Sequence, residues 1–305
     1  MFEKISIIIP VYNEAEKIEK TLIDVFNQTY NNIEVIIIND GSTDNTAEIC
    51  KTIENDNFIY FEINNGGPAN ARNVGIEHAS GKYICFLDAD DEVEKNHIQL
   101  LYEHLRNNQV QLAVSRATCG HNDENIYVEE WENAAYRILK NDDYGGFLWN
   151  KLFCTEIIRE NNLSLNTDFW MCEDLVFVLE YLRSCKIVAF INSCTYHYVE
   201  GHGISKFSLT PKRLTEFYAK KYIQDHLVSD KNEKVYNLVL DMCVSLSIRY
   251  YIKLIFCDHT FRQIKVDVAE EICAFYPVFK NHKKIPLKLK MLGAIIYFYE
   301  KGLNR

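Results

Sequence analysis

Three aspartates within four positions, Asp88, Asp90 and Asp91, are the groups in this sequence best placed to do chemistry. They follow directly on the apolar run 83–87, which is typical of a strand buried on both faces of a parallel sheet. Unpaired buried carboxylates are costly, so stability does not explain acids at this position. Carboxylates two apart at such a strand end can hold a hard divalent cation, with substrate phosphates completing its shell. The alternative is that they only begin the next helix, whose dipole favours acids.

A second acidic pair, Glu173 and Asp174, lies just before a run with helical apolar spacing that begins at Leu175. Compensation of the helix dipole is the structural explanation for acids at this position. The chemical explanation is that one of these carboxylates takes a proton from an attacking hydroxyl group. Both explanations are compatible with the sequence.

The elements that must position these groups alternate along the first part of the chain. Apolar runs at 5–10, 34–38, 58–62 and 83–87 predict strands, and the segments between them predict helices with short connections. This order predicts an α/β fold with a Rossmann-like, doubly wound, mostly parallel sheet, whose carboxyl edge binds ligands. The residues expected to converge at that edge are Tyr12, Glu14, Asp40, Asn65, Arg72, Asp88 and Asp90.

From Pro211 onward the pattern is helical throughout, which predicts two parts: a domain over 1–208 and an α-helical appendage over 209–305. Several lysines between 280 and 290 lead into the apolar segment 291–299. That composition is typical of an interfacial helix and predicts peripheral membrane contact. The alternative is a final helix packed on its own core after a solvated basic segment. The apolar segment is too short to span a bilayer.

Composition narrows the class of protein further. A net charge of −10 over 305 residues argues against nucleic-acid binding. The ten cysteines form no dense framework, and we expect them to be reduced, mostly as small core residues. The first four residues lead straight into a strand without a signal peptide, so we expect a cytoplasmic protein. The sequence has no glycine-rich phosphate loop. A dehydrogenase or a P-loop kinase would therefore lack the loop that binds its phosphates.

The motifs at the strand ends together resemble those of family 2 glycosyltransferases. They run in order as Ile9-Pro10-Val11-Tyr12-Asn13-Glu14, Asn39-Asp40-Gly41-Ser42-Thr43-Asp44, Ala71-Arg72-Asn73 and Asp88-Ala89-Asp90. The resemblance is dense over the first ~115 residues and thinner to about residue 205. It implies the A-type glycosyltransferase fold, a UDP-sugar donor and a divalent metal, Mn²⁺ or Mg²⁺.

The resemblance also implies roles for individual residues. Asp40 would accept a hydrogen bond from the uracil N3–H, and Asp90 would ligate the metal. Asp88 would lie where the ribose and the metal meet. The other residues assigned to the nucleotide-sugar site are Pro10, Tyr12, Glu14, Asn65, Arg72 and Ala89.

Three further regions complete the expected site. Glu173-Asp174 resembles the family's Glu-Asp motif, so Asp174 would be the base and Glu173 would orient the acceptor. Trp149 offers a face for a sugar ring or is a buried core residue, and Lys151 contacts the diphosphate or acceptor or lies on the surface. His202, flanked by glycines, is a candidate third metal ligand or phosphate contact. Val199 stands where the family usually has arginine, which departs from its pattern.

The sequence therefore predicts a metal-dependent, inverting glycosyltransferase that moves a sugar from a UDP-sugar to a hydroxyl of a glycan, glycolipid or teichoic-acid-like acceptor. A non-catalytic module that binds nucleotide-sugars or partners is one alternative. A sugar nucleotidyltransferase is a weaker one, because residues 9–14 lack the glycine-rich basic loop that it needs. If the acceptor is lipid-linked, the protein is expected at the inner face of the cell membrane.

Overall fold

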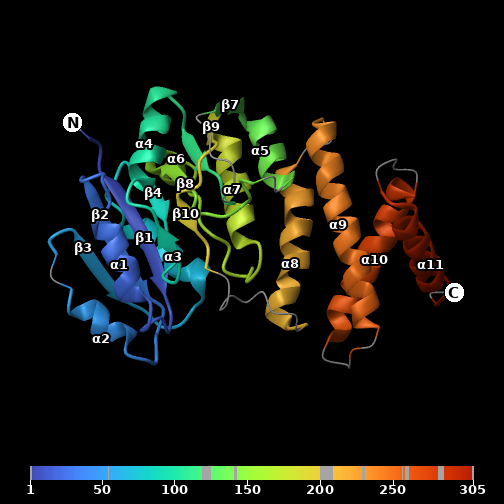
Figure 1. Cartoon of the computed structure of the whole chain (residues 1–305). Coiled ribbons are helices and arrows are strands. Elements are labelled where there is room, and N and C mark those ends of the chain that lie inside the picture. Colours follow the sequence, from blue (N-terminus) through green and yellow to red (C-terminus); the bar gives the residue numbers. More distant parts are fainter. Residues whose placement is uncertain are drawn as a thin grey trace. The chain divides into compact units, whose positions relative to one another are not determined.

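The computed structural model of the chain describes residues 2–53, 55–118, 125–140, 143–199, 209–228, 231–255, 257, 261–280 and 285–303. The chain divides into two compact units, Met1–Lys206 and Phe207–Arg305. The first contains a sheet flanked by helices, and the described part of the second is helical (Figure 1).

The first unit is built on an eight-stranded sheet in the order β3-β2-β1-β4-β8-β6-β9-β7. The strands are β1 (Ile5–Val11), β2 (Ile33–Asn39), β3 (Phe58–Glu62), β4 (Tyr83–Phe86), β6 (Leu112–Ser115), β7 (Ile126–Glu130), β8 (Lys151–Cys154) and β9 (Ile187–Ile191). Strands β7 and β8 are antiparallel to their neighbours, and all other pairs in the sheet are parallel. A separate antiparallel pair joins β5 (Glu92–Val93) to β10 (Tyr196–His197).

In the part of the first unit that the structure describes, the helices between the strands are α1 (Ile18–Phe26), α2 (Thr46–Lys51), α3 (Pro68–His78), α4 (His97–Asn107), α5 (Trp131–Lys140), α6 (Thr155–Glu160) and α7 (Glu173–Ser184). Strand β1 pairs with β2 on one side and with β4 on the other, so the strand order reverses between β1 and β4. Ligands bind at such a switch point in open α/β sheets. The predicted α/β fold with a doubly wound, mostly parallel sheet is confirmed.

Alternate residues of the central strands face different helices, because side chains along a strand point to opposite faces. Ile7 and its odd-numbered neighbours in β1 share a buried cluster with α1 and α4. Ile8 faces α3, where a Cβ added to Gly75 would lie 2.3 Å from its side chain. Phe86 of β4 packs edge-on against Phe177 of α7. Burial on both faces explains why these strands are continuously apolar.

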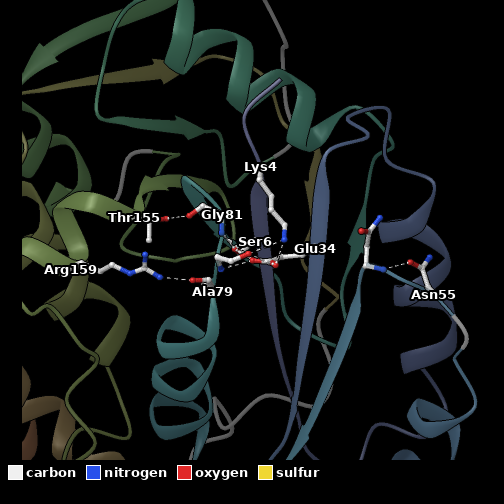
Figure 2. A network of polar contacts seen from close by, with 10 residues as sticks. Lys4, Ser6, Glu34, Asn55, Ala79, Gly81, Thr155 and Arg159 are labelled. Carbon is white, nitrogen blue, oxygen red and sulfur yellow. Dashed lines mark hydrogen bonds and ion pairs between the residues drawn. The ribbon is translucent and has the colours of Figure 1, made fainter. Parts of the chain in front are cut away.

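The amino ends of the strands are held together by a buried carboxylate. Glu34 of β2 lies beside Ser6 of β1 in register and accepts hydrogen bonds from the Ser6 hydroxyl and the N–H and hydroxyl groups of Ser80. The Lys4 ammonium lies 2.6 Å from a Glu34 oxygen. Figure 2 shows this network, in which the Gly81 N–H donates to the Ser6 hydroxyl and to the Glu34 carboxylate. Burial alone would raise the pKa of Glu34, but these hydrogen bonds lower it to about 2.

We expect Glu34→Gln to reduce the free energy of unfolding at pH 7 by about 2–3 kcal/mol, because the lowered pKa of Glu34 reflects net stabilisation of its charged form. The difference from wild type is fully present above the ordinary pKa of 4.5. It shrinks as the pH falls towards 2, where the folded carboxyl is also protonated. Urea unfolding at pH 7 and pH 3 measures this difference.

The matched control is Glu62→Gln, since Glu62 is half exposed and pairs with Lys51 at the surface. Such pairs contribute roughly 0–1 kcal/mol. Equal destabilisation by the two substitutions would contradict the role given to Glu34.

The second unit contains α8 (Pro211–Tyr222), the π-helical turn η1 (Ile223–Leu227), α9 (Glu233–Leu254), α10 (Arg262–Phe279) and α11 (Leu287–Leu303). Its own buried cluster includes Leu240 and Ile248 of α9, Val268 of α10 and Ile296 of α11. No helix in the part of the chain that the structure describes is long and apolar enough to cross a bilayer.

One expectation about the cysteines is wrong. Cys194 is disulfide-bonded, whereas the sequence suggested reduced cysteines throughout. The other described cysteines form no disulfide bond, and Cys50, Cys85, Cys185 and Cys243 are buried as the sequence suggested.

Candidate functional site

The carboxyl ends of β1, β2 and β4 place their following loops side by side at the switch point. The Asp40 N–H after β2 donates to the carbonyl of Val11 at the end of β1, at 2.9 Å. After β4, the Leu87 N–H donates to the carbonyl of Ile8 at 3.1 Å. These bonds extend the sheet pairing into the loops. Tyr12, Asp40 and Asp88, which follow the three strands, therefore lie at the same edge of the sheet.

Asp40 lies in a backbone cradle at this edge. It is 4% exposed, and its two carboxylate oxygens accept the N–H groups of Gly66 and Gly67, each at 2.8 Å. The Asn65 amide donates to the Asp40 carbonyl at 2.9 Å and so ties the two loops together. Burial raises the pKa of Asp40 while the two N–H groups oppose that rise. Each oxygen keeps a lone pair that can accept a further N–H group.

Gly67 is required for this cradle. Its φ of +88° is in the region that favours glycine, and an added Cβ would lie 3.0 Å from the Trp170 ring. Trp170 therefore covers the loop that holds Asp40, a role that no local pattern in the sequence indicated.

The loop after β1 is fastened to the loop after β2. The Asn13 side chain accepts the Thr43 N–H at 2.7 Å, and the Glu14 N–H donates to the Thr46 hydroxyl at 2.9 Å. Pro10 is the penultimate residue of β1 and is partly buried, whereas Tyr12 is 47% exposed at the rim. Tyr12 follows Val11, whose carbonyl accepts the Asp40 N–H, and an exposed aromatic ring at this edge is suited to stack against a planar base.

Arg72 links both acidic clusters. Its guanidinium donates from Nη2 to Asp88 Oδ1 at 2.9 Å, and from Nη1 to Asp174 Oδ1 at 3.1 Å and Glu173 Oε1 at 3.5 Å. Arg72 is 6% exposed, on α3, while Glu173 and Asp174 begin α7 a hundred residues later. The structure therefore brings the carboxylate after β4 and the Glu173-Asp174 pair to one cation.

Three carboxylates around one guanidinium leave excess negative charge in a buried place. Burial raises the pKa of Asp174 to about 7, and it also raises the pKa of Glu173, in spite of the nearby Arg72. Burial would lower the pKa of Arg72, but Asp174, Asp88 and Glu173 hold it above its usual value. A carboxylate poised near neutral pH is suited to accept a proton.

The loop from Asp88 to Asp91 contains two accessible acids and one buried acid. The side chains of Asp88 and Asp90 are 27% and 23% exposed. Asp91 accepts the Tyr196 hydroxyl at 2.8 Å and the Val199 N–H at 2.9 Å, and burial raises its pKa to about 7. The Tyr196 hydroxyl in turn accepts the Asp88 N–H at 3.0 Å. Asp91 and Tyr196 thus fix the backbone that presents the other two acids.

This loop fits a divalent metal. Among the described residues no three His, Cys, Asp or Glu side chains form a complete metal site. Mg²⁺ is usually held by one or two carboxylates together with substrate phosphates, and Asp88 and Asp90 supply such oxygens. Ala89, between them, is buried and accepts the Thr21 hydroxyl through its carbonyl at 2.8 Å. His202 lies outside the described residues.

The surroundings of Trp149 and Lys151 differ from those expected for a sugar platform and for a contact with the diphosphate or acceptor. Trp149 is 5% exposed, and its ring stacks on Tyr196 at 4.3 Å and on Phe147 at 5.0 Å. Neighbouring rings thus occupy the faces of Trp149. Of the two alternatives, the structure agrees with a buried core residue. Phe147, 40% exposed, is the accessible aromatic of this stack.

Lys151 is fully buried and supports a loop. Its ammonium donates to the carbonyls of Gly145 and Phe147 at 2.9 and 2.6 Å and to the Asn150 side chain at 2.8 Å. Burial lowers its pKa to about 7. Its hydrogens are committed to the loop, so the expectation of direct contact with a diphosphate or acceptor is corrected to a supporting role.

Several known proteins are similar to this chain in sequence or in fold. The family described as Glycosyl transferase family 2 matches residues 6–165. Glycosyltransferase GlyG of Streptococcus pneumoniae serotype 4 (strain ATCC BAA-334 / TIGR4) is 31% identical over 244 residues, which cover 72% of this chain and 80% of GlyG. The uncharacterized glycosyltransferase EpsJ of Bacillus subtilis (strain 168) is 29% identical over 249 residues, 77% of this chain and 70% of EpsJ. Glycosyltransferase GlyA of the same Streptococcus is 40% identical over 114 residues, only 16% of its own length.

The fold also matches a solved structure, that of S. aureus TarS residues 1–349 in complex with UDP. The TM-score is 0.72 at 18% identity, and the match covers 98% of this chain and 92% of the TarS chain. The same part of TarS in complex with UDP-GlcNAc gives a TM-score of 0.71. Together with the family match over residues 6–165, these likenesses lead to one conclusion. The chain is a glycosyltransferase and belongs to glycosyl transferase family 2.

Proposed function

We propose that this enzyme transfers a sugar from a UDP-sugar to a hydroxyl of a glycan, glycolipid or teichoic-acid-like acceptor, with a divalent metal and with inversion. Residues 1–208 form the catalytic domain, and residues 209–305 are a helical region outside the chemistry. The observation that carries this proposal is the contact of Arg72 with both Asp88 and Asp174. It supports the proposal because Asp88, the acid proposed for the donor side, and Asp174, the acid proposed for the acceptor side, bind one guanidinium.

Asp174 is the candidate catalytic base. It accepts the proton of the acceptor hydroxyl as that oxygen attacks the anomeric carbon, and the bond from this carbon to the distal phosphate oxygen of UDP breaks. A single displacement of this kind inverts the anomeric centre. Glu173, 9% exposed and bound to the same arginine, orients the acceptor.

The donor binds at the carboxyl edge of the sheet. Asp40 accepts the uracil N3–H, Tyr12 packs on the base, and Glu14 and Asn65 help to enclose the nucleoside. Asp88 and Asp90 would hold Mn²⁺ or Mg²⁺, which would supply charge neutralisation for the diphosphate. The complexes of TarS with UDP and UDP-GlcNAc support UDP as the nucleotide.

Incubation with a panel of UDP-sugars and manganese tests this proposal by the release of UDP. We expect slow release with water alone and faster release when the correct acceptor is added. Release of GDP from GDP-mannose, or of dTDP from dTDP-glucose, without release of UDP from any UDP-sugar would contradict the choice of nucleotide. Tight UDP binding without release from any UDP-sugar or acceptor would favour the non-catalytic alternative.

The second unit supports a proposal of peripheral membrane contact at the inner face of the membrane. Helix α11 packs Ile296 into its own core but exposes a stripe of large apolar side chains, each 59–72% exposed. The stripe consists of Leu287, Met291, Ile295, Phe298 and Tyr299. Lys288, Lys290 and Lys301 flank it with positive charge, which complements anionic lipid head groups.

We expect the double substitution Ile295→Glu/Phe298→Glu to weaken binding to phosphatidylglycerol vesicles by about tenfold or more, since burial of each side chain contributes about 1.5–3 kcal/mol. Vesicle sedimentation measures the change, with Val266→Glu on α10, another exposed apolar position, as the matched control. Equal sedimentation of wild type and double variant would contradict the proposal. So would a stable dimer that the double substitution dissociates, because the stripe would then bind a second copy.

A further inference from the structure

Lys17 stands at the point where the loop after β1 enters α1, directly against the Asp88–Asp91 loop. Its N–H donates to the Glu14 carbonyl at 3.0 Å, which closes the first turn. One turn further, the Thr21 hydroxyl donates to the Ala89 carbonyl at 2.8 Å. Residues four apart lie on one face of a helix, so Lys17 shares with Thr21 the face that packs on this loop.

The ammonium of Lys17 lacks a hydrogen-bond acceptor within the described part of the chain. Its nitrogen is buried, although 27% of the side chain is exposed, and it lies 3.8 Å from Asp90 Oδ2. That distance permits attraction between charges but is too long for a hydrogen bond. The ammonium of Lys151, by contrast, has several acceptors.

A buried ammonium with three donors and no acceptor is costly, because it has lost water without replacement. Movement of Asp90 towards Lys17 would supply an acceptor but would withdraw that carboxylate from a metal. An anionic ligand that arrives beside Asp90 satisfies Lys17 and leaves Asp90 free. Phosphate oxygens have the charge and the acceptor capacity that this position needs.

We infer that Lys17 is a donor-binding residue whose ammonium hydrogen-bonds to the distal phosphate of the nucleoside diphosphate. This inference rests on the proposed function and adds a second cation to the expected metal. The distal phosphate gains negative charge as its bond to the sugar breaks, so a fixed ammonium there stabilises the transition state more than the bound donor. Lys17 therefore contributes to UDP affinity and to the rate of transfer.

Calorimetric titrations of UMP and UDP with manganese, into wild type and Lys17→Met, test the inference. We expect Lys17→Met to weaken UDP binding by about tenfold, the effect of losing a hydrogen bond to a charged group. UMP lacks the distal phosphate, so its affinity should change by less than about threefold. Lys17→Arg keeps the charge and should recover most of the UDP affinity.

Lys20→Met is the matched control, because Lys20 lies on the same helix, is largely exposed and pairs with Glu92. Unchanged UDP affinity in Lys17→Met would overturn the inference and leave the proposed function intact. Equal weakening of UMP and UDP would also overturn it, since the effect would then lie at the nucleoside or in the fold. Failure of wild type to bind UDP would overturn the proposed function first, and this inference with it.

Discussion

Asp174→Asn is expected to reduce transfer by about 10²–10⁴-fold while UDP affinity stays close to that of wild type, because a positioned general base contributes a factor of this size. The amide has the shape of the carboxylate, and its oxygen can still accept from Arg72 Nη1, which lies 3.1 Å from Asp174 Oδ1. It cannot take up the proton of the acceptor hydroxyl. Product formation from a UDP-sugar and calorimetry with UDP measure the two effects separately.

Asp168→Asn is the control for this substitution, since Asp168 is an exposed acid in the segment just before α7. It should leave transfer and UDP binding unchanged. Full transfer by Asp174→Asn would exclude Asp174 as the base. Loss of UDP binding together with transfer would mean that Asp174 acts on the donor side.

The pH dependence of transfer follows from the same residue. The pKa of Asp174 is raised to about 7 by burial, and the base must be deprotonated to act. The rate at low substrate concentration should therefore rise as the pH increases through about 7 and level off above it. A rate that is already constant between pH 5 and pH 8 would contradict this assignment.

Asp90→Ala is expected to abolish the dependence of UDP binding on manganese. Loss of a group that merely supports a metal ligand costs roughly 10–100-fold in metal affinity, and loss of the ligand itself should cost at least as much. Calorimetry with UDP in the presence of manganese or EDTA measures the effect. Uridine lacks the diphosphate, so it should bind the variant and wild type equally.

Glu92→Gln is the matched control here, because Glu92 follows closely in sequence but is half exposed and pairs with Lys20. It should retain full manganese dependence. The same dependence in Asp90→Ala would show that the metal is held elsewhere.

Local signals in the sequence were sufficient for the first half of the fold. Strands β1, β2 and β4 are buried on both faces, so each appears as a continuous apolar run, and polar residues follow directly at the edge where ligands bind. The convergence of Asp40 and Asp88 could be predicted because parallel strands end at the same edge. Strands β5, β7, β8, β9 and β10 were not predicted, since they lie outside the β-α-β repeat of the first four strands.

The surroundings of several other residues depend on contacts between distant parts of the chain. Trp149 is covered by Tyr196, which is 47 positions away, and Asp91 is bound by the same tyrosine. Lys151 resembles a surface or ligand-binding lysine until its carbonyl partners are known. Arg72 was expected beside the nucleotide, but only the folded chain brings Asp174 to its other side. Local periodicity carries no information about such pairings.

Calorimetric titration of UDP into the purified protein, with and without manganese, tests the central claim most directly. We expect binding with manganese and much weaker binding in EDTA, because in the proposed site Asp88 and Asp90 would need the cation to hold the diphosphate. Equal binding in both conditions would retain the nucleotide site but contradict the metal role. No binding of UDP in either condition would contradict the assignment of a UDP-sugar donor.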